Sequence, residues 1–473
     1  MKLQELLKKH PRYEKHIDEW NFLKVSYEGG QEYEDAQLLW QYTYEKLKNV
    51  GDLNAQQAYR ERLQQTPLDN QCESAISTYT SYIWRRRPQR DLGKFKQNQQ
   101  MLSMLEDCDF AGTSLDEFMR QVQEAGHVYG HCWIMVDKPE VKYKTLAQEL
   151  KRGIRPYLVR YIPQQIWNWE YQRGENGQFE LTYIKICETD ICRNGKEKQI
   201  IRIWTKEIIE IYEIIDGKLE SETPVKTIPN ALGIIPIVCH YSRKIKQFGI
   251  GCSDIKDIAR MQCSIYNDLS ELHQTIRITN HNTLVKNKND NSSAGAGGVI
   301  IMDDETDPQK KPYLLQPQIF SLTGLIQAIQ KKTDMINWMA HTAPVKNQRN
   351  TQVSGEALKT EFQLLNSLLN EIAAGLKTTE IRVLKVFTRW LGRERDFYSI
   401  NVVYPMKFEL RDTKSELELL KEAKALDVQS QEYRRQIDKQ IATITLEEDD
   451  KLESINAEID KATYAMSDTT PTA

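Results

Sequence analysis

The sequence lacks the cysteine pairs and the long apolar runs that mark secreted and membrane proteins. Its eight cysteines form no C-x-x-C pair, so we expect reduced, intracellular thiols. No apolar run approaches the ~18 residues of a membrane span. The first ten residues carry four Lys or Glu, which indicates no signal peptide. We therefore expect synthesis in a cytosol-like compartment and no membrane partner.

The chain also lacks the basic excess of a tight nucleic-acid binder. Its formal net charge is −3 and its isoelectric point is near 6.3, so any DNA contact must be local or weak. Charged residues make up 28% and mean hydropathy is −0.62, a composition typical of long helices with solvated faces. At 473 residues the chain exceeds what one core accommodates, and we expect several connected lobes.

Catalytic and nucleotide-binding motifs are missing too. The glycine cluster that begins at Gly295 has no following Lys and Ser or Thr, so it cannot cradle a phosphate. There is no nucleophile elbow, zincin helix or dinucleotide fingerprint. The sequence therefore predicts a protein that is not an enzyme and needs no cofactor, and any energy-consuming role would need a separate ATPase.

Four local patterns allow a functional and a structural interpretation. Acids 303–305 suit Mg²⁺ but are typical of a solvated turn. His127, His131 and Cys132 could bind a metal, yet Gly130 and the β-run after it favour a strand entry. The alternating aromatic residues around Trp167 and Trp169 could stack bases or lie buried in a sheet. Arginines 85–87 before Pro88 could contact DNA or mark a helix end.

Residues 252–355 carry the most informative order of elements. A helix beginning at Ser253 or Asp254 has an apolar stripe and stops after Asn280. Short strands follow at 283–285, 299–302 and 313–315, around a polar, glycine-rich stretch. A second amphipathic helix runs from Ser321 to before Pro344, and the basic loop 342–355 precedes a long helix to Trp390. This order suggests part of a channel.

The remaining segments predict helices over 1–92 and 413–462, and one antiparallel sheet domain within 127–241. A further strand pair or long strand is expected over 397–410. The β-rich runs of the sheet domain are 133–136, 157–162, 166–171, 179–186, 200–204, 208–214 and 235–240, punctuated by Asn-Gly and Asp-Gly turns.

Taken together, these elements resemble a tailed-bacteriophage portal protein. The likeness is carried by Tyr59-Arg-Glu-Arg to Pro88, by the β-run 128–137, and by Pro163-Gln-Gln-Ile-Trp-Asn-Trp169. It continues through the helix from Ser253 to Leu269 and the segment Ser354-Gly-Glu-Ala-Leu358. The likeness covers nearly the whole chain through the order of elements, although the crown is short and there is no long C-terminal barrel segment.

The resemblance implies an α+β, portal-like multidomain subunit with long stem helices, an antiparallel β-rich wing, a small α/β clip and a helical crown. The expected domains are the wing at 1–251, stem helix 1 at 252–281, the clip at 282–318, stem helix 2 at 319–341, the tunnel loop at 342–355, the long wing helix and returning strand at 356–412, and the crown and polar tail at 413–473.

By the same resemblance, twelve copies form a ring at one capsid vertex, assembled in the host cytoplasm and kept in the virion, through which double-stranded DNA is packaged and ejected. The implied partners are the terminase large subunit, tail adaptor proteins, and the major capsid and scaffolding proteins. The basic residues expected to contact DNA weakly in the channel are Lys331, Lys332, Lys346 and Arg349. The clip residues expected to dock the terminase and adaptors are Lys286, Lys288, Asp303, Asp304, Glu305, Lys310 and Lys311.

Two alternatives stay open. One is a metal-dependent nuclease, or another nucleic-acid enzyme, that uses Asp303, Asp304 and Glu305. The other is a helical scaffold protein with no DNA role.

Overall fold

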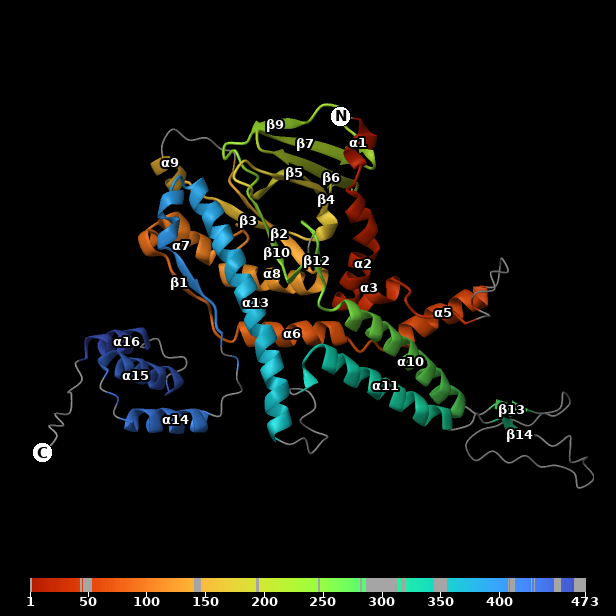
Figure 1. Ribbon diagram of the computed structural model, residues 1–473. Coiled ribbons are helices and arrows are strands. Elements are labelled where there is room, and N and C mark those ends of the chain that lie inside the picture. Colours follow the sequence, from red (N-terminus) through yellow and green to blue (C-terminus); the bar gives the residue numbers. More distant parts are fainter. Residues whose placement is uncertain are drawn as a thin grey trace, which may run out of the picture. The chain divides into compact units, whose positions relative to one another are not determined.

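The computed structural model shows an α+β chain with antiparallel sheets (Figure 1). It forms two compact units, Met1–Lys407 and Phe408–Ala473, which are described separately as unit 1 and unit 2. The structure describes residues 2–42, 45, 53–139, 146–192, 195–245, 247–280, 283–285, 313–315, 320–343, 355–406, 408, 413–426, 428, 430–445 and 452–462. No described helix is long and apolar enough to cross a membrane.

The N-terminal part of unit 1 is helical, as predicted. Its helices are α1 (Leu3–Leu7), α2 (Pro11–Glu28), α3 (Gly30–Asp35), α5 (Leu53–Gln65) and α6 (Gln71–Ile83). The Asn70 side chain accepts the Glu73 N–H at the start of α6, a usual N-cap. Helix α6 ends at Ile83. Arginines 85–87 therefore follow a helix end, which is the position that the helix-end interpretation of these residues predicted. A short strand, β1 (Gln89–Asp91), and the 3₁₀ turn η1 (Gly93–Phe95) come next.

Helices α7 (Gln99–Glu106) and α8 (Leu115–Tyr129) lead into strand β2 (His131–Asp137). His127 lies in the last turn of α8, so the change from helix to strand comes later than the predicted switch at 127. Gly130 makes the turn with a φ of 83°, in the left-handed region. A Cβ on Gly130 would lie 2.5 Å from the backbone of Cys252, so only glycine fits here.

All seven predicted β-runs are strands, but they form two sheets rather than one. The larger sheet holds β4 (Ile166–Arg173), β5 (Phe179–Ile191), β6 (Glu197–Thr205), β7 (Ile208–Ile215) and β8 (Lys218–Leu219), with β9 (Lys226–Pro229) also on β7. The smaller sheet has the order β10 (Ile237–Tyr241), β2, β3 (Tyr157–Tyr161). Trp167 and Trp169 are buried at 8% and 5% exposure, which confirms the sheet-core interpretation.

The expected strand over 397–410 is wrong in most of its length. Residues Glu394–Ser399 form a 3₁₀ turn, η4, and only Asn401–Val403 form a strand, β15, which pairs antiparallel with β1. The partner strand has three residues, which limits how far the pairing can extend. The predicted long helix is confirmed as α13 (Gly355–Trp390), which packs against β10, β2 and α6.

A buried ion network joins these elements. Arg90 of β1 lies 2.6 Å from Glu380 of α13 and 2.5 Å from Asp116 of α8. Glu380 is fully buried, and Tyr404 donates its hydroxyl hydrogen to it at 2.6 Å. Burial and the Glu380 charge raise the pKa of Tyr404 well above its usual value, so Tyr404 remains a donor. One carboxylate thus receives donors from β1 and from the segment after β15.

Unit 2 consists of three helices in the part that the structure describes. They are α14 (Thr413–Ala425), α15 (Gln431–Thr445) and α16 (Leu452–Lys461), which confirms the helices expected over 413–462. Helix α15 packs on both neighbours, and Ile437 and Ile444 are its buried apolar residues. Two ion pairs, from Lys424 to Asp438 and from Lys439 to Asp460, join the helices.

Replacing Arg90 with Met should destabilise the chain by about 3–5 kcal/mol, because it leaves the Glu380 charge buried without its partner. The free energy of unfolding, measured by urea titration, reports this loss. The matched control is Lys94→Met, which removes the exposed pair with Asp396 and should leave stability unchanged within error. If both substitutions lower the free energy of unfolding equally, the buried Arg90 network contributes no more to stability than an exposed ion pair.

Candidate channel helices and their anchors

The first candidate channel helix is α10 (Lys256–Asn280), close to the predicted bounds. Its N-terminal side is fixed by Asp254, whose Oδ2 lies 2.7 Å from Nδ1 of His127 at the end of α8. The Ser242 hydroxyl also donates to Asp254, and Arg243 pairs with its Oδ1 at 3.1 Å. Burial raises the pKa of Asp254, but the hydrogen bond and charge of His127 and the Ser242 bond lower it overall.

This Ser, His and Asp group is not arranged for nucleophilic catalysis. A catalytic triad places the serine and the carboxylate on opposite ring nitrogens of the histidine. Here Ser242 and Asp254 both face Nδ1 of His127, while Nε2 faces the Gln123 side chain at 3.2 Å. The group therefore joins α8 to the start of α10 and offers no route for a proton from serine to Nε2.

Two further histidines, His131 and His240, lie buried near this anchor. His240 Nδ1 lies 2.9 Å from the Thr379 hydroxyl of α13, and His131 Nδ1 accepts the Gly251 N–H. Burial lowers the pKa of both to about 3, so both are neutral. In the described part of the chain no three His, Cys, Asp or Glu side chains gather as a metal site would require. Gly130 ends α8 and His131 begins β2, so the strand-entry interpretation holds for His131 and Cys132, whereas His127 lies in the helix.

The N-terminal half of α10 packs against other helices of unit 1. Ile255, Ile258 and Ile265 of the predicted stripe are at most 2% exposed, and α10 contacts α2 and α6. Gln262 accepts the Cys72 N–H and donates to the Ser26 carbonyl, which fixes the helix to both neighbours. Asn267 accepts the Trp40 N–H at 2.7 Å. These polar contacts set the rotation of α10 about its axis.

A buried arginine holds α5 against α10. Arg62 of α5 makes two hydrogen bonds to the Glu45 carboxylate, at 3.2 and 2.7 Å, and one to the Ser270 hydroxyl of α10 at 3.0 Å. Its guanidinium lies 4.1 Å from the centre of the Tyr42 ring. Such bidentate, stacked contacts use the planar guanidinium, which lysine lacks.

The second candidate helix, α11 (Phe320–Met339), packs beside α10 (Figure 1). Lys332 donates to Ser264 at 2.8 Å and pairs with Asp268 at 2.5 Å, both on α10. At the other end of the segment Tyr79 of α6 donates to the Ala340 carbonyl at 2.6 Å. Among the side chains of this helix, Ile336 is fully buried.

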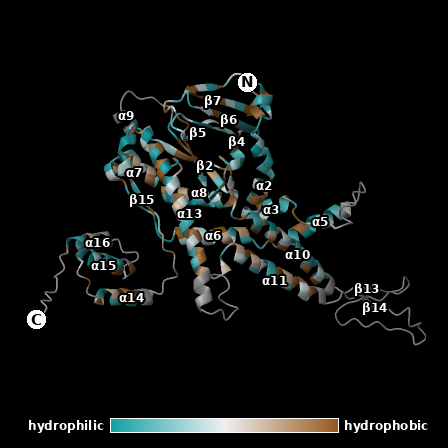
Figure 2. Cartoon of the chain, viewed as in Figure 1, coloured by the Kyte–Doolittle hydropathy of each residue, from teal (hydrophilic) through white to brown (hydrophobic). Residues whose placement is uncertain are grey.

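Helix α11 also exposes large apolar side chains. Trp338 is 64% exposed, and Ile326, Met335 and Met339 are between 41% and 49% exposed. Figure 2 shows hydrophobic residues along this helix. Leu364 of α13 is also exposed, at 56%. We call Met335, Trp338 and Met339 the α11 face, because these three residues lie on one side of the helix, whereas Ile326 lies on another. A single surface leucine needs no explanation, but a tryptophan beside two exposed methionines indicates a contact surface.

The predicted channel residues divide into two groups. Lys331 is exposed and makes no ion pair among the described residues, whereas Lys332 is held by Asp268. Lys346 and Arg349 lie outside the described residues, and so do all seven predicted clip residues and the acids 303–305 of the nuclease alternative. The role of each remains a prediction.

Two short strands border the predicted clip. Strand β13 (Thr283–Val285) pairs antiparallel with β14 (Tyr313–Leu315), with Leu284 opposite Leu314. Both strands were predicted, and the third, at 299–302, lies outside the described residues. This pairing brings the chain that leaves α10 close to the chain that enters α11.

Sequence reasoning missed the residues that hold the two helices in place. Arg62, Gln262 and Asn267 have no local pattern that distinguishes them from solvated residues, and the sequence predicts Lys332 as a DNA contact rather than as the partner of Asp268. The one local pattern that pointed to the anchor of α10 was the pair of helix-capping residues Ser253 and Asp254, and Ser253 does accept the Ile255 N–H. Asp254 additionally pairs with a histidine 127 positions earlier, which no local spacing predicts.

Comparisons with known proteins give similarity in structure alone. No family model and no curated protein matches the sequence. The chain is similar to a chain of the neck of an empty gene transfer agent (GTA) particle computed with C6 symmetry, at 10% identity and a TM-score of 0.44, over 77% of this chain and 89% of that one. It is also similar to a chain of the virion of a native gene transfer agent particle, at 11% identity and 0.42, over 77% and 88%. A third is a chain of the neck of a native GTA particle computed with C12 symmetry, at 10% and 0.37, over 79% and 92%.

Replacing His240 with Asn should reduce the acid sensitivity of folding. Between about pH 6.5 and pH 3, this histidine binds a proton in the unfolded chain but stays neutral when buried in the folded chain. The free energy of unfolding therefore falls as pH falls, by about 1.4 kcal/mol per pH unit for each such group. From about pH 6.5 to about pH 5 the variant should therefore lose about 2 kcal/mol less than the wild-type chain. Urea titrations at both pH values measure the difference. If the free energy of unfolding falls equally with pH in the variant and the wild-type chain, His240 is not neutral in the folded state.

Proposed function

We propose that this chain is a portal subunit, twelve copies of which form a ring at one capsid vertex as the channel for packaging and ejecting double-stranded DNA. The observation that carries the proposal is the α11 face, beside a helix that is itself packed into unit 1. Exposed apolar patches of this kind mark contact surfaces. A neighbouring copy would cover the α11 face, and head-to-tail contacts of this kind close into rings.

The charges of the two channel helices suit a conduit. Helix α10 carries three basic and three acidic residues, Lys256, Arg260 and Arg277 with Asp257, Asp268 and Glu271. Lys332 of α11 is paired with Asp268. Dense neutralisation of phosphates would raise affinity steeply through counterion release and hold the DNA still. Sparse contacts from Lys331, Lys346 and Arg349 would instead be weak and independent of DNA sequence.

The segment between α10 and α11 would serve as the clip, on which the terminase large subunit docks during packaging and tail adaptors dock later. Pairing of β13 with β14 supports this role because it brings together the two ends of a polar excursion. Partners that replace one another need a polar, reversible surface. The major capsid and scaffolding proteins would contact the ring at the capsid vertex during assembly in the host cytoplasm.

Purified chain should form twelvefold rings with a central hole, and Trp338→Asp should shift it towards monomers because it places a charge in the contact. Electron micrographs and mass photometry at micromolar concentration measure both results. The matched control is Leu102→Asp, which charges an exposed leucine of α7 instead and should leave rings intact. A wild-type chain that stays monomeric would overturn the proposal.

Charge reversal at Lys346 and Arg349 should spare ring assembly but impair DNA packaging or retention, since these residues would touch passing DNA. Packaged DNA per particle is the quantity to measure, in particles that carry Lys346→Glu with Arg349→Glu. Lys331→Glu provides the comparison on a described, exposed residue. If packaging is unchanged in the double variant, these two residues have no part in the mechanism.

A further inference from the structure

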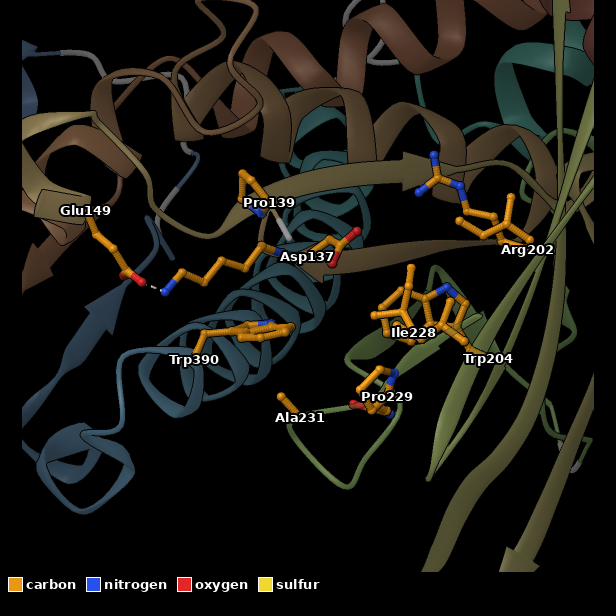
Figure 3. Close-up of a pocket in the computed structure, with 13 residues that line it drawn as sticks. Asp137, Pro139, Glu149, Arg202, Trp204, Ile228, Pro229, Ala231 and Trp390 are labelled. Atoms are coloured by element: carbon orange, nitrogen blue, oxygen red, sulfur yellow. Dashed lines mark hydrogen bonds and ion pairs between the residues drawn. The ribbon is translucent and has the colours of Figure 1, made fainter. Parts of the chain in front are cut away.

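Trp40 is the most exposed tryptophan of the chain. All nine tryptophans lie within the described residues, and only Trp40 and Trp338 are more than half exposed, at 68% and 64%. The others are buried or half-buried; Trp204 and Trp390, for example, line a cavity of about 380 Å³ between the larger sheet and the end of α13 (Figure 3). Tryptophan is among the residues most enriched at the energetic centres of interfaces, and Trp338 already belongs to the α11 face. Trp40 therefore needs an explanation of its own.

The segment that carries Trp40 is held firmly by unit 1. Asn267 of α10 accepts the Trp40 N–H at 2.7 Å, and Arg62 of α5 donates to the Trp40 carbonyl at 2.5 Å. The preceding residue, Leu39, is 3% exposed and belongs to a buried apolar cluster with Tyr33 of α3. The Trp40 backbone is thus fixed while its indole remains outside. A side chain on such a fixed backbone loses little conformational freedom when a partner covers it, and is preorganised for contact.

Trp40 and the α11 face belong to different sides of α10. Figure 1 shows α3 and α5 on one side of α10 and α11 on the other. Trp40 bonds to Asn267, whereas α11 reaches α10 through Lys332, which contacts Ser264 and Asp268. At 3.6 residues per turn, Asn267 points roughly a quarter of a turn away from those two residues. A head-to-tail contact in a ring needs two unlike patches on separate sides of one chain, and these two meet that requirement.

The charges beside the two patches are opposite in sign. Lys331 lies on the same side of α11 as the α11 face, and it makes no ion pair among the described residues. The one acid of α11 already accepts a hydrogen bond from a glutamine of its own helix. At the end of α3, Glu34 and Asp35 have no cationic partner in the described part of the chain, and residues 29–41 contain no Lys or Arg. Two Trp40 segments would bring acids together and two α11 faces would bring lysines together, whereas the unlike pairing joins opposite charges.

We propose that Trp40 of one copy packs on the α11 face of the next copy, while Lys331 beside that face pairs with the two acids at the end of α3. The flexible methionine side chains of the α11 face adapt to an aromatic ring and make favourable sulfur contacts with it. Lys331 lies at the rim of this contact, where its three donors can also serve water or a passing phosphate. The inference rests on the proposed ring and names the two surfaces by which neighbouring copies meet.

Trp40→Asp should convert rings of the full chain to monomers, as Trp338→Asp should, while circular dichroism stays unchanged because the indole is exposed. An equimolar mixture of the two variants should give dimers that grow no further. Each dimer has one intact contact, and both of its free ends carry a charged substitution. Mass photometry of each variant and of the mixture measures these sizes. The matched control is Tyr398→Asp, which charges another exposed aromatic residue, in η4, and should leave rings intact.

Asp35→Lys tests the charge pairing separately. It sets a second cation against Lys331, so the chain concentration at which rings form should rise. The increase should shrink at high salt, because exposed charges are screened there. Glu175→Lys makes the same charge change in the turn between β4 and β5, and should leave ring formation unchanged.

The outcomes separate this contact from the ring itself. If Trp40→Asp still forms rings, the ring stands and Trp40 is not part of its contact. If both variants are monomeric and their mixture is too, the two tryptophans do not meet across one interface, and the inference fails. Rings that persist in both variants would assign the α11 face to another protein and would also contradict the inference. A wild-type chain that stays monomeric overturns the ring and this contact together.

Discussion

The fully buried carboxylate of Glu380 is the constraint on which much of unit 1 depends. A charge without water is stable only when donors surround it, and here the donors come from Arg90 and Tyr404, far apart in the sequence. Arg90 in turn reaches Asp116 at the start of α8. Helix α13 therefore cannot turn or slide without separating a charge from its partners, which also fixes the short pairing of β1 with β15.

Other buried polar side chains with several partners also join elements that are distant in sequence. Lys185 of β5 is 2% exposed and donates to the carbonyls of Glu5, Leu6 and Lys8 at the C-terminal end of α1. Burial lowers the pKa of Lys185 to about 8. Arg62 and Asp254 act similarly at the two ends of the contact between α10 and the rest of unit 1. Apolar burial supplies the bulk of stability, and these few polar groups determine which arrangement is adopted.

This division explains how much the sequence could predict. Periodicity is local, so the long helices, the seven β-runs and the short strands β13 and β14 were predicted close to their bounds. Partner choice is not local. The split into two sheets depends on β10 returning to β2 across about a hundred residues, and nothing in either strand specifies that partner. The wrong strand over 397–410 has the same origin, since its length is set by the three residues of β1. The DNA-contact and clip residues came from resemblance rather than from local physics.

The hydrogen bonds that hold α10 differ in kind from the contacts that the α11 face can make, and this difference bears on function. Towards unit 1, α10 is tied by specific side-chain hydrogen bonds from Gln262 and Asn267, which set one orientation. The α11 face instead has exposed apolar side chains, and the part of the chain that the structure describes shows no comparable network there. Apolar contacts are non-directional and tolerate small sliding movements better than hydrogen-bond networks do. In the proposed ring, such contacts would let neighbouring subunits adjust, while the hydrogen bonds of Gln262 and Asn267 hold α10 in one orientation.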